Sequence, residues 1–479
     1  MNEISRKLGS KGVWYYFSLI CATPHPSGKE QYLAQLLAAE ARSRDLQVRF
    51  DHFGNMRIER KAAPGMENRP TVIFQAHLDM VPQKAAGFEF DFSKDPLPVR
   101  VQNNRIDCAG KTTLGADDGI GVALAMDILS DQELQCGPLA AVFTLQEEIG
   151  LNGARVLAPE FLQGDYLINL DSGDDKCFYA GCAGGVEIFG FFTPEYTKTP
   201  EGFPLKISVR GLKGGHSGVE IHQKRGNAHK FLAAFLSESP EILAAASFEG
   251  GSAVNAISKE SESVVISAVS PEELKRTADV FASELAKNFN APENFGFDII
   301  ACPAPEKVWS EDFRKRFLNA VTALPDGVLE YSSEIDCVCT SCNLGVVTMK
   351  SDGRIKLGIH PRAFDDKDWQ QVSAAVGNML RQLGAVVEEH SPYPGWKFKS
   401  DSRLLKEAGK VYEKVYGSKP DIKAVHAGLE PGLFTTMAPE LEMISFAPEC
   451  GNEHTTEEFL LIDSTEKVAF WLRELVKSL

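Results

Sequence analysis

The sequence lacks any hydrophobic run that approaches the roughly 18 apolar residues of a membrane span. The nearest stretch is the largely apolar segment 13–22, which follows Arg6, Lys7 and Lys11. It is only loosely similar to a signal peptide, because Glu3 lies in the would-be basic region and no small-x-small cleavage site follows. Its large residues recur at helical spacing. We therefore expect an N-terminal helix that packs on the core, and no membrane association.

An excess of basic residues is also missing. Lysine and arginine together number 50, against 66 aspartates and glutamates, which gives a formal net charge of −16. Nucleic acids and anionic membrane surfaces attract basic patches, so neither is an expected partner. An acidic balance serves solubility in most proteins and can also draw in cations or basic peptides.

Cysteine pairs at zinc-finger spacing are absent as well. The ten cysteines are scattered, and the closest group is Cys337, Cys339 and Cys342, with no second pair to complete a site. We therefore expect reduced thiols, as in a cytoplasmic protein. A Gly-x-Gly-x-x-Gly turn after the first strand is also missing, which disfavours a Rossmann-type nucleotide binder.

The length of the chain, 479 residues, exceeds one ordinary core, so we expect two or three domains. Strand and helix patterns alternate over the first 185 residues, which predicts an α/β fold with a mainly parallel, doubly covered sheet. Near Gly184 the pattern changes. Strict alternation over 204–210 and a hairpin signal at 351–353 predict an α+β unit with its own antiparallel sheet, up to a rigid linker at 392–395.

Acidic residues follow several of the predicted hydrophobic strands. They are Asp79, Asp117, Glu147, Glu148 and Asp171. Carboxylates at the ends of hydrophobic strands cost desolvation energy unless something compensates their charge. A pair of divalent metal ions is the simplest compensation. Together with the late His454, this spacing predicts a dinuclear metallohydrolase, with the acids at the carboxyl ends of the strands, where such sheets bind ligands.

The spacing of the first acids indicates separate roles. His77 and Asp79 are two residues apart in a strand and share a face, so His77 can bind a metal while Asp79 orients its imidazole. Asp117 lies in a glycine-flanked loop before a helix, where it can bridge two ions. Its neighbour Asp118 is then a helix cap or a loop residue.

Glu147 and Glu148 are the most informative pair. Adjacent residues at a strand end point to opposite sides, so one can bind a metal while the other reaches the reacting water. Taken singly, a His-x-Asp strand end and two solvated glutamates are ordinary features. The recurrence of acidic strand ends over 75–171 favours the metal interpretation, with Asp171 as a terminal ligand and His454 completing the set.

Eight motifs extend this pattern along nearly the whole chain. They are Pro24-His25-Pro26-Ser27, Gln75-Ala76-His77-Leu78-Asp79-Met80-Val81, Thr113-Leu114-Gly115-Ala116-Asp117, Gln146-Glu147-Glu148-Ile149-Gly150, Gly181-Cys182-Ala183-Gly184-Gly185, Gly211-Leu212-Lys213-Gly214-Gly215-His216-Ser217-Gly218, Tyr393-Pro394-Gly395-Trp396 and His426-Ala427-Gly428-Leu429-Glu430. Their combination resembles the aminoacyl-histidine (β-alanyl-histidine, Xaa-His) dipeptidases. That family belongs to the dinuclear zinc peptidases related to carboxypeptidase G and the aminoacylases.

The resemblance implies two Zn²⁺ ions per chain, for which Co²⁺ or Mn²⁺ can substitute. Asp117 would bridge both ions. His77 and Asp171 would complete one site, and Glu148 and His454 would complete the other.

The resemblance also implies the catalytic groups and the domain plan. Glu147 would be the general base and Asp79 the acid behind His77. Residues 1–186 and 397–479 would form a zinc-exopeptidase catalytic domain, and 187–396 an inserted α+β lid and dimerisation domain. In the expected homodimer, His216 of this lid would reach a neighbouring active site and stabilise the oxyanion.

Substrate-binding residues follow from the same resemblance. They are His216, Asn255, Arg362, Gly428 and Glu430. An arginine can receive the C-terminal carboxylate of a peptide through bidentate hydrogen bonds. Three departures from the family pattern concern substrate preference: Asp118 replaces an asparagine, 454–458 differs from the usual last-ligand segment, and alanine and phenylalanine follow Arg362.

We therefore predict a cytoplasmic, homodimeric enzyme that hydrolyses unblocked dipeptides, preferentially Xaa-His. A zinc-activated water would attack, with Glu147 as general base. The alternatives are an aminoacylase or a broader dipeptidase of the same superfamily. A catalytically silent metal-binding scaffold is a third alternative, which the complete set of ligands together with Glu147 disfavours.

Overall fold

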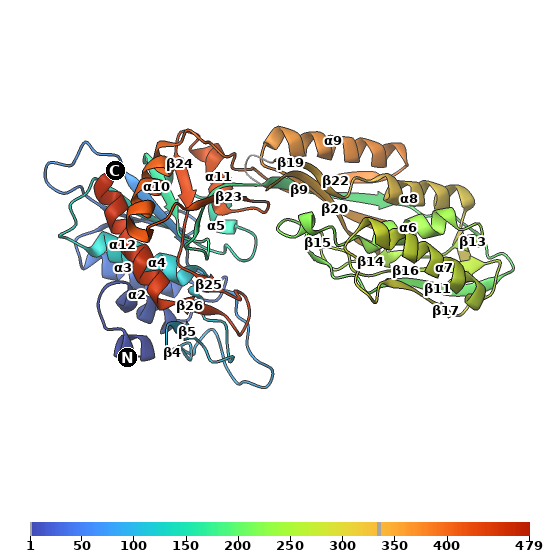
Figure 1. The fold of residues 1–479 in the computed structure, drawn as a ribbon, viewed down its shortest axis with the longest axis horizontal. Helices are drawn as coiled ribbons and strands as arrows, with labels where there is room; N and C mark the ends of the chain where they lie inside the picture. The colour runs from blue at the N-terminus through green and yellow to red at the C-terminus, as the bar shows by residue number, and fades with distance from the viewer. Residues whose placement is uncertain (1, 333–336) are drawn as a thin grey trace. The chain divides into compact units, whose positions relative to one another are not determined.

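The computed structural model describes residues 2–332 and 337–479, and Figure 1 traces the chain from the N-terminus in blue to the C-terminus in red. The chain forms two compact units. Unit 1 consists of 1–181, 396–424 and 429–479, and unit 2 consists of 182–395 and 425–428. Each unit has its own cluster of buried apolar side chains, as expected for independent domains.

Unit 1 is built on an eight-stranded sheet. In spatial order its strands are β1 (Gln47–Phe50), β2 (Met56–Arg60), β6 (Leu139–Thr144), β3 (Val72–His77), β7 (Tyr166–Asn169), β24 (Glu442–Ser445), β8 (Cys177–Cys182) and β23 (Asp421–Val425). The four central strands, β6, β3, β7 and β24, are parallel. In Figure 1 the late elements of unit 1, in orange and red, lie among the blue and cyan early ones.

The flanks of this sheet differ from the mainly parallel arrangement that the sequence predicted. β1 pairs antiparallel with β2, β2 with β6, and β24 with β8. The chain between β1 and β2 is short, and a short connection permits only antiparallel pairing. The predicted α/β class is confirmed, with parallel pairing confined to the centre of the sheet.

Helices pack around the unit 1 sheet. They are α1 (Glu3–Lys7), α2 (Gly12–Cys21), α3 (Gln31–Arg42), α4 (Ala116–Ser130), α5 (Asn152–Arg155), α10 (Arg403–Tyr416), α11 (Glu430–Met437) and α12 (Ile462–Ser478). The predicted N-terminal helix is α2, which packs on α4, and α4 in turn packs on β3. α4 is buried on nearly every face, as its uniformly apolar sequence indicated. A small sheet joins β4 (Arg100–Gln102), β5 (Arg105–Asp107), β25 (Cys450–Gly451) and β26 (Phe459–Leu461).

Unit 2 is built on a ten-stranded antiparallel sheet. Its main order is β17 (Gly296–Ala301), β11 (Phe203–Arg210), β16 (Ser261–Ser267), β14 (Glu249–Gly250), β20 (Cys337–Met349), β21 (Ile355–Ala363), β9 (Gly184–Phe192) and β22 (Val386–Tyr393). β13 (Ile242–Ala245) pairs with β16, and β19 (Gly327–Ser332) pairs with β20. The predicted hairpin at 351–353 joins β20 to β21, so the expected α+β character of this region is confirmed.

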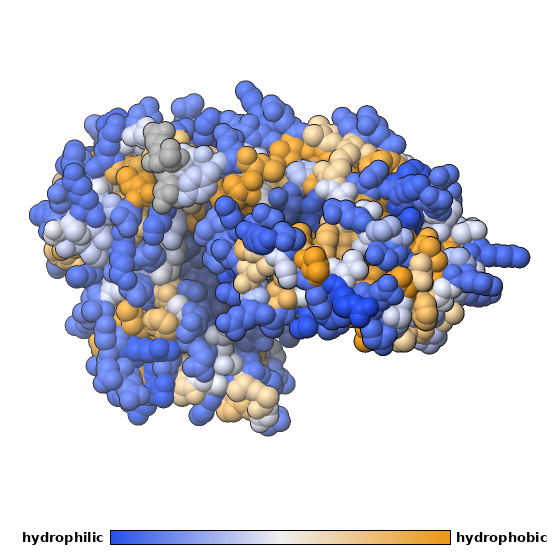
Figure 2. Space-filling view, turned by 45° about the vertical axis from the view of Figure 1, so that its right-hand side comes forward, coloured by the Kyte–Doolittle hydropathy of each residue, from blue (hydrophilic) through white to orange (hydrophobic). Residues whose placement is uncertain are grey.

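The remaining elements of unit 2 are short strands and the helices that cover its sheet. The short pairs are β12 (Gly215–His216) with β15 (Ala256–Ile257) and β10 (Tyr196–Lys198) with β18 (Lys307–Trp309), and the helices are α6 (Ala228–Glu238), α7 (Pro271–Leu285), α8 (Glu311–Ala323) and α9 (Asp366–Gln382). Hydrophilic residues cover most of the face that Figure 2 shows. Within 2–332 and 337–479, no helix combines the length and the apolar character that crossing a membrane requires.

Candidate metal centre

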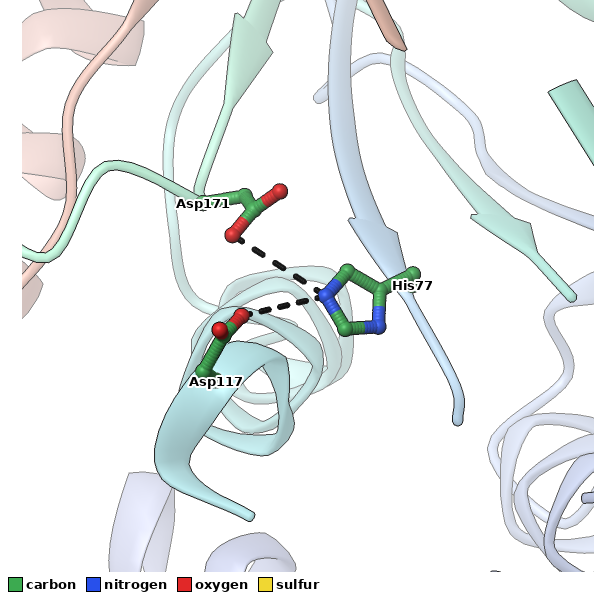
Figure 3. Close-up of side chains that lie close together, drawn as sticks. All are labelled: His77, Asp117 and Asp171. Carbon is green, nitrogen blue, oxygen red and sulfur yellow. Dashed lines mark hydrogen bonds and ion pairs between the residues drawn. The ribbon is translucent and has the colours of Figure 1, made fainter. Parts of the chain in front are cut away.

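The first group of candidate ligands lies at the carboxyl edge of the parallel strands in unit 1. His77 is the last residue of β3, and its side chain is buried. Its Nε2 atom lies 3.1 Å from Oδ1 of Asp117 and 3.9 Å from Oδ1 of Asp171, which follows β7 (Figure 3). Strands that run parallel end at the same edge, which is why residues so far apart in sequence meet here.

The other ring nitrogen of His77 faces oxygen atoms of Asp79. Nδ1 lies 3.0 Å from the Asp79 backbone carbonyl and 3.6 Å from its Oδ1. These acceptors place a proton on Nδ1 and leave Nε2 for a metal, as in many metal-binding histidines. Burial alone would lower the pKa of His77, but the contacts with Asp117 and Asp79 raise it well above its usual value.

Asp117 lies between two histidines. It is near the start of α4, where Asp117 and Asp118 have non-helical backbone angles. Its Oδ1 faces His77, and its Oδ2 lies 3.2 Å from Nε2 of His454. Burial opposes ionisation, yet the hydrogen bonds with His454 and His77 hold the pKa of Asp117 well below its usual range. One carboxylate thus offers an oxygen atom to each side, as a bridging ligand must.

A second group forms around His454. Its Nε2 lies 2.8 Å from Oε1 of Glu148, and contacts with Asp117 and Glu148 raise the pKa of His454 to about 10. Among the described residues, ligand atoms lie within 4.8 Å of one another in three sets, His77–Asp117–Asp171, Asp117–Glu148–His454 and His77–Glu147–Glu148. The first two sets match the predicted pair of sites and share Asp117. The third set brings both Glu147 and Glu148 near His77.

Glu147 is partly buried beside these groups. Burial raises its pKa to about 8, and the negative charges of Glu430, Glu148 and Asp117 add to the shift, which His77 opposes. A carboxyl group whose pKa is near neutrality is suited to accept and return a proton. The structure therefore places a candidate general base next to the candidate ligands.

The buried carboxylate of Asp79 organises both sides of the site. Its oxygens accept hydrogen bonds from the backbone N–H of Glu147 at 2.9 Å and of Glu148 at 3.3 Å, and from Oγ of Ser27 at 2.8 Å. The same carboxylate faces the ring of His77. Asp79 thus fixes a ligand and the Glu147–Glu148 loop together.

Two buried acids have positions that the sequence interpretation missed. Asp118, expected to be a cap or loop residue, accepts the backbone N–H of His77 at 3.2 Å and does not cap α4. Glu458 accepts four backbone N–H groups, those of residues 114–117, at 2.7–3.4 Å. The only signal for Glu458 was its place in the last-ligand segment after His454.

Four of the predicted substrate-binding residues belong to unit 2. His216 is in β12, and its Nδ1 accepts the backbone N–H groups of Gly218 at 3.1 Å and Val219 at 3.2 Å. A neutral His216 therefore carries its proton on Nε2 and can donate it to an acceptor. The Asn255 side chain is exposed, and its backbone carbonyl accepts the N–H of Ser217.

Arg362, in β21, is buried, with 4% of its surface exposed. Its Nη1 donates to the hydroxyl oxygen of Tyr393 at 2.6 Å, and that oxygen lies 3.2 Å from Nε2 of His360. The Nε–H of Arg362 has no hydrogen-bond partner among the described residues. Gly428 packs closely against Tyr393: a Cβ atom at position 428 would lie only 3.0 Å from the ring.

Three histidines share the environment of Arg362. Burial, with the positive charge of Arg362, lowers the pKa of His216, lowers that of His360 well below its usual value, and lowers that of His426 to about 3. The cluster is therefore neutral except for Arg362 at ordinary pH.

Glu430, the fifth predicted substrate-binding residue, belongs to unit 1. It opens α11 and has 2% of its surface exposed. Its Oε2 accepts hydrogen bonds from Gln75 at 2.5 Å and Thr144 at 2.9 Å. These contacts place its carboxylate inside the sheet edge, which disfavours direct contact with a substrate.

Comparison with known proteins identifies the architecture. Residues 73–478 match the model of the peptidase family M20/M25/M40. The chain belongs to this family. The family that the motifs predicted is thereby confirmed, and with it the prediction of a peptidase. Family members are metallopeptidases, in agreement with the candidate ligand groups of unit 1.

Individual relatives of this M20 family member match along its whole length. The cytosol non-specific dipeptidase of Escherichia coli (strain K12) is 35% identical, over 100% of this chain and 99% of that relative. The crystal structure of aminoacylhistidine dipeptidase from Vibrio alginolyticus is 34% identical and superposes with a TM-score of 0.88, over 100% of this chain and 98% of that one. Aminopeptidase PepT of Bacillus cereus, at 16% identity and a TM-score of 0.57, shares the fold.

Proposed function

We propose that this protein is a two-metal dipeptidase. The observation that carries the proposal is the position of Asp117, whose two carboxylate oxygens face His77 on one side and His454 on the other. Asp171 and Glu148 complete the two groups. Both whole-length relatives are named as dipeptidases, which supports the substrate class.

The donor atoms of unit 1 fit zinc. Imidazole nitrogens and carboxylate oxygens are ligands that Zn²⁺ accepts, and Co²⁺ and Mn²⁺ accept the same set. His77, Asp171 and Asp117 would hold one ion, and Asp117, Glu148 and His454 the other. Bound ions of this kind polarise a carbonyl group and lower the pKa of a bound water towards 7.

Glu147 supplies the acid–base chemistry in this proposal. Its carboxylate takes a proton from the attacking water and returns it to the amine that leaves. Asp79 holds the backbone of Glu147 and the ring of His77, so the base and one ligand keep a fixed separation. A preorganised pair of this kind avoids reorganisation during the reaction.

Arg362 receives the free C-terminal carboxylate of the substrate. A buried guanidinium with an unpaired Nε–H favours an anionic partner, because an isolated buried charge is costly. Tyr393 holds one side of the guanidinium, and Asn255 and Gly428 contribute to the same substrate-binding role. Every unblocked dipeptide carries this carboxylate, so recognition by Arg362 permits a broad range of residues, with Xaa-His dipeptides such as β-alanyl-histidine among the preferred substrates.

We also propose a cytoplasmic homodimer, in line with the resemblance and with the cytosolic relative of Escherichia coli. In this dimer His216 donates its Nε2 proton to the oxyanion that forms in the partner's active site. The inserted region 187–396 would act as lid and dimerisation domain.

Metal analysis coupled to a substrate panel tests the proposal. Purified protein should contain two zinc equivalents per chain and should hydrolyse Xaa-His and other unblocked dipeptides. N-acyl amino acids and C-terminally amidated dipeptides are the matched controls. Faster hydrolysis of N-acyl amino acids would favour an aminoacylase, and full activity with a single metal equivalent would contradict the bridged site.

A further inference from the structure

A row of buried polar side chains crosses the centre of the unit 1 sheet. Gln75 on β3, Asn169 on β7 and Ser445 on β24 are cross-strand neighbours, since Gln75 pairs with Asn169 and Asn169 pairs with Ser445. All three are at most 1% exposed, in strands that are otherwise nearly all apolar. Burying polar groups in such a layer is costly unless each is hydrogen-bonded, so the row calls for an explanation.

The hydrogen bonds in this row form one continuous chain that ends on Glu430. Ser445 Oγ donates to Oδ1 of Asn169 at 2.5 Å, and Asn169 Nδ2 donates to Oε1 of Gln75 at 2.7 Å. Gln75 Nε2 then donates to Oε2 of Glu430 at 2.5 Å. Thr144, on β6, donates to the same oxygen at 2.9 Å.

The Oε2 atom of Glu430 sets the direction of the whole chain. This oxygen accepts hydrogen bonds from both Gln75 and Thr144, so Gln75 presents its amide N–H₂ to Glu430 and its carbonyl oxygen to Asn169. Asn169 must then present its own N–H₂ to Gln75 and its oxygen to Ser445. Each amide therefore has a single orientation. Polarised chains of this type are stronger than their separate bonds, and they rigidify the elements that they join.

The row lies next to the candidate metal ligands, two residues before them along the chain in β3 and β7. His77 follows Gln75 by two residues in β3, so both side chains lie on the same face of the strand. Asp171 follows Asn169 by the same interval, just beyond the end of β7. His77 and Asp171 are the two ligands of the first metal group besides Asp117. The ligands specific to the second group, Glu148 and His454, lie on loops outside the row.

We propose that this relay, consisting of Ser445, Asn169, Gln75, Thr144 and Glu430, positions His77 and Asp171 and thereby sets the affinity of one of the two metal ions. This inference rests on the proposed two-metal function. It makes Glu430 a positioning residue that orients the relay, in place of the substrate contact that the resemblance implied. The relay acts by fixing the side-chain spacing of β3, β7 and β24 at the edge where the ligands emerge.

Stepwise zinc titration of the metal-free full chain, in competition with a chromophoric chelator, tests the relay. In Ser445→Ala we expect one of the two zinc ions to bind about tenfold or more weakly, the usual effect of losing a group that orients a ligand, while the other keeps its affinity within about twofold. Glu430→Gln, which keeps the size of the side chain, should weaken the same ion. The matched control is Ser18→Ala, because Ser18 is a buried residue of α2 whose hydroxyl donates to Oδ1 of Asn2, outside the relay.

The outcomes separate the relay from the proposed function. A wild-type chain that binds only one zinc ion would contradict the two-metal function itself. If the wild type binds two ions but Ser445→Ala and Glu430→Gln weaken both equally, or neither, the relay has no selective role and the proposal is wrong. Thermal unfolding of the metal-free variants measures any general loss of stability, which should be similar in Ser445→Ala and Ser18→Ala.

Discussion

The candidate sites of the two units bury charge of opposite sign. Unit 1 gathers carboxylates around two histidines at one edge of its sheet. Unit 2 instead buries Arg362 beside three histidines, and Arg362 has no ion-pair partner among the residues described. An unbalanced buried charge is expensive, so each arrangement indicates the sign of what it binds: cations in unit 1 and an anion in unit 2. In the proposed dipeptidase these would be the metal ions and the substrate carboxylate.

The largest effect should come from removing the base of unit 1 while leaving its cation sites in place. Glu147→Gln should lower kcat by about 10²- to 10⁴-fold, the usual contribution of a general base. Zinc content should stay at two equivalents, because Glu147 is not one of the assigned ligands. Glu148→Gln is the matched control and should lose metal. The reverse pattern would exchange the roles of the two glutamates.

The next effect concerns the one histidine that the proposal assigns to a partner's site. His216→Ala should lower kcat by about 10²-fold, the scale of losing one oxyanion donor. Mixing this inactive variant with inactive Glu147→Gln should restore partial activity, since a heterodimer then contains one intact site. Native mass spectrometry would verify subunit exchange. Exchange without recovery would place His216 in its own chain's site or outside catalysis.

Removing the buried cation of unit 2 should have a smaller effect. Loss of a charge-assisted hydrogen bond costs about 1.5–3 kcal/mol, so Arg362→Ala should lower kcat/KM about ten- to a hundredfold. It should also abolish most discrimination against C-terminally amidated dipeptides. Arg354→Ala, a partly exposed arginine in the same hairpin, is the control and should change neither quantity. Unchanged discrimination in Arg362→Ala would remove Arg362 from carboxylate recognition.

A still smaller effect is expected from the group that holds Arg362. Tyr393→Phe keeps the ring that packs against Gly428 but removes the oxygen that accepts from Nη1. A hydrogen bond to a charged group contributes about 1.5–3 kcal/mol, and because Tyr393 acts on the substrate only through Arg362, we expect part of this effect, a roughly two- to tenfold increase in KM with little change in kcat. A fall in kcat at constant KM would instead tie Tyr393 to the chemical step.

The burial of acids in unit 1 and of histidines in unit 2 also predicts opposite pH dependence in the metal-free protein. The pKa of Glu147 is raised to about 8 and that of Glu430 to about 7, so their contribution to stability is present at acid pH and lost as pH rises through these values. The pKa of His426 is lowered to about 3 and that of His229 to about 4. Their contribution is present above about pH 6.5 and is lost as pH falls below it.

Limited proteolysis with mass mapping would resolve this difference between the units. At pH 8.5 unit 1 should be cleaved first, and at pH 5 unit 2 should be cleaved first. Between these two pH values the unfolding temperature of each unit should shift by a few degrees. Cleavage rates would be normalised on an unfolded peptide at each pH. The same order of cleavage at both pH values would show that these groups do not govern stability.

Short-range pattern was enough to predict much of this molecule. The alternation of strands and helices indicated the α/β class, and the acids after β3, β6 and β7 indicated where the metal groups lie. These features depend on strand periodicity and on the common edge of parallel strands, and both can be read locally. The roles of the individual ligands stay predictions that the geometry supports.

Long-range partners could not be read in this way. Glu458 contacts the backbone of Leu114, 344 residues earlier in the chain, and nothing local distinguishes it from its neighbour Glu457. The relay to Glu430 likewise depends on strands that become neighbours only in the folded sheet. The antiparallel direction of the flanking pairs was missed for a related reason, because a strand pattern does not specify the direction of pairing.

The place of β24 in the unit 1 sheet has a consequence for synthesis on the ribosome. This strand lies between β7 and β8, yet Ser445 is 276 residues beyond its partner Asn169. At roughly 5–20 residues per second, about 14–55 s elapse before the missing strand emerges. Throughout this interval the position of β24 between β7 and β8 is unfilled, while all of unit 2 has time to fold. The catalytic centre is therefore completed only near the end of chain synthesis.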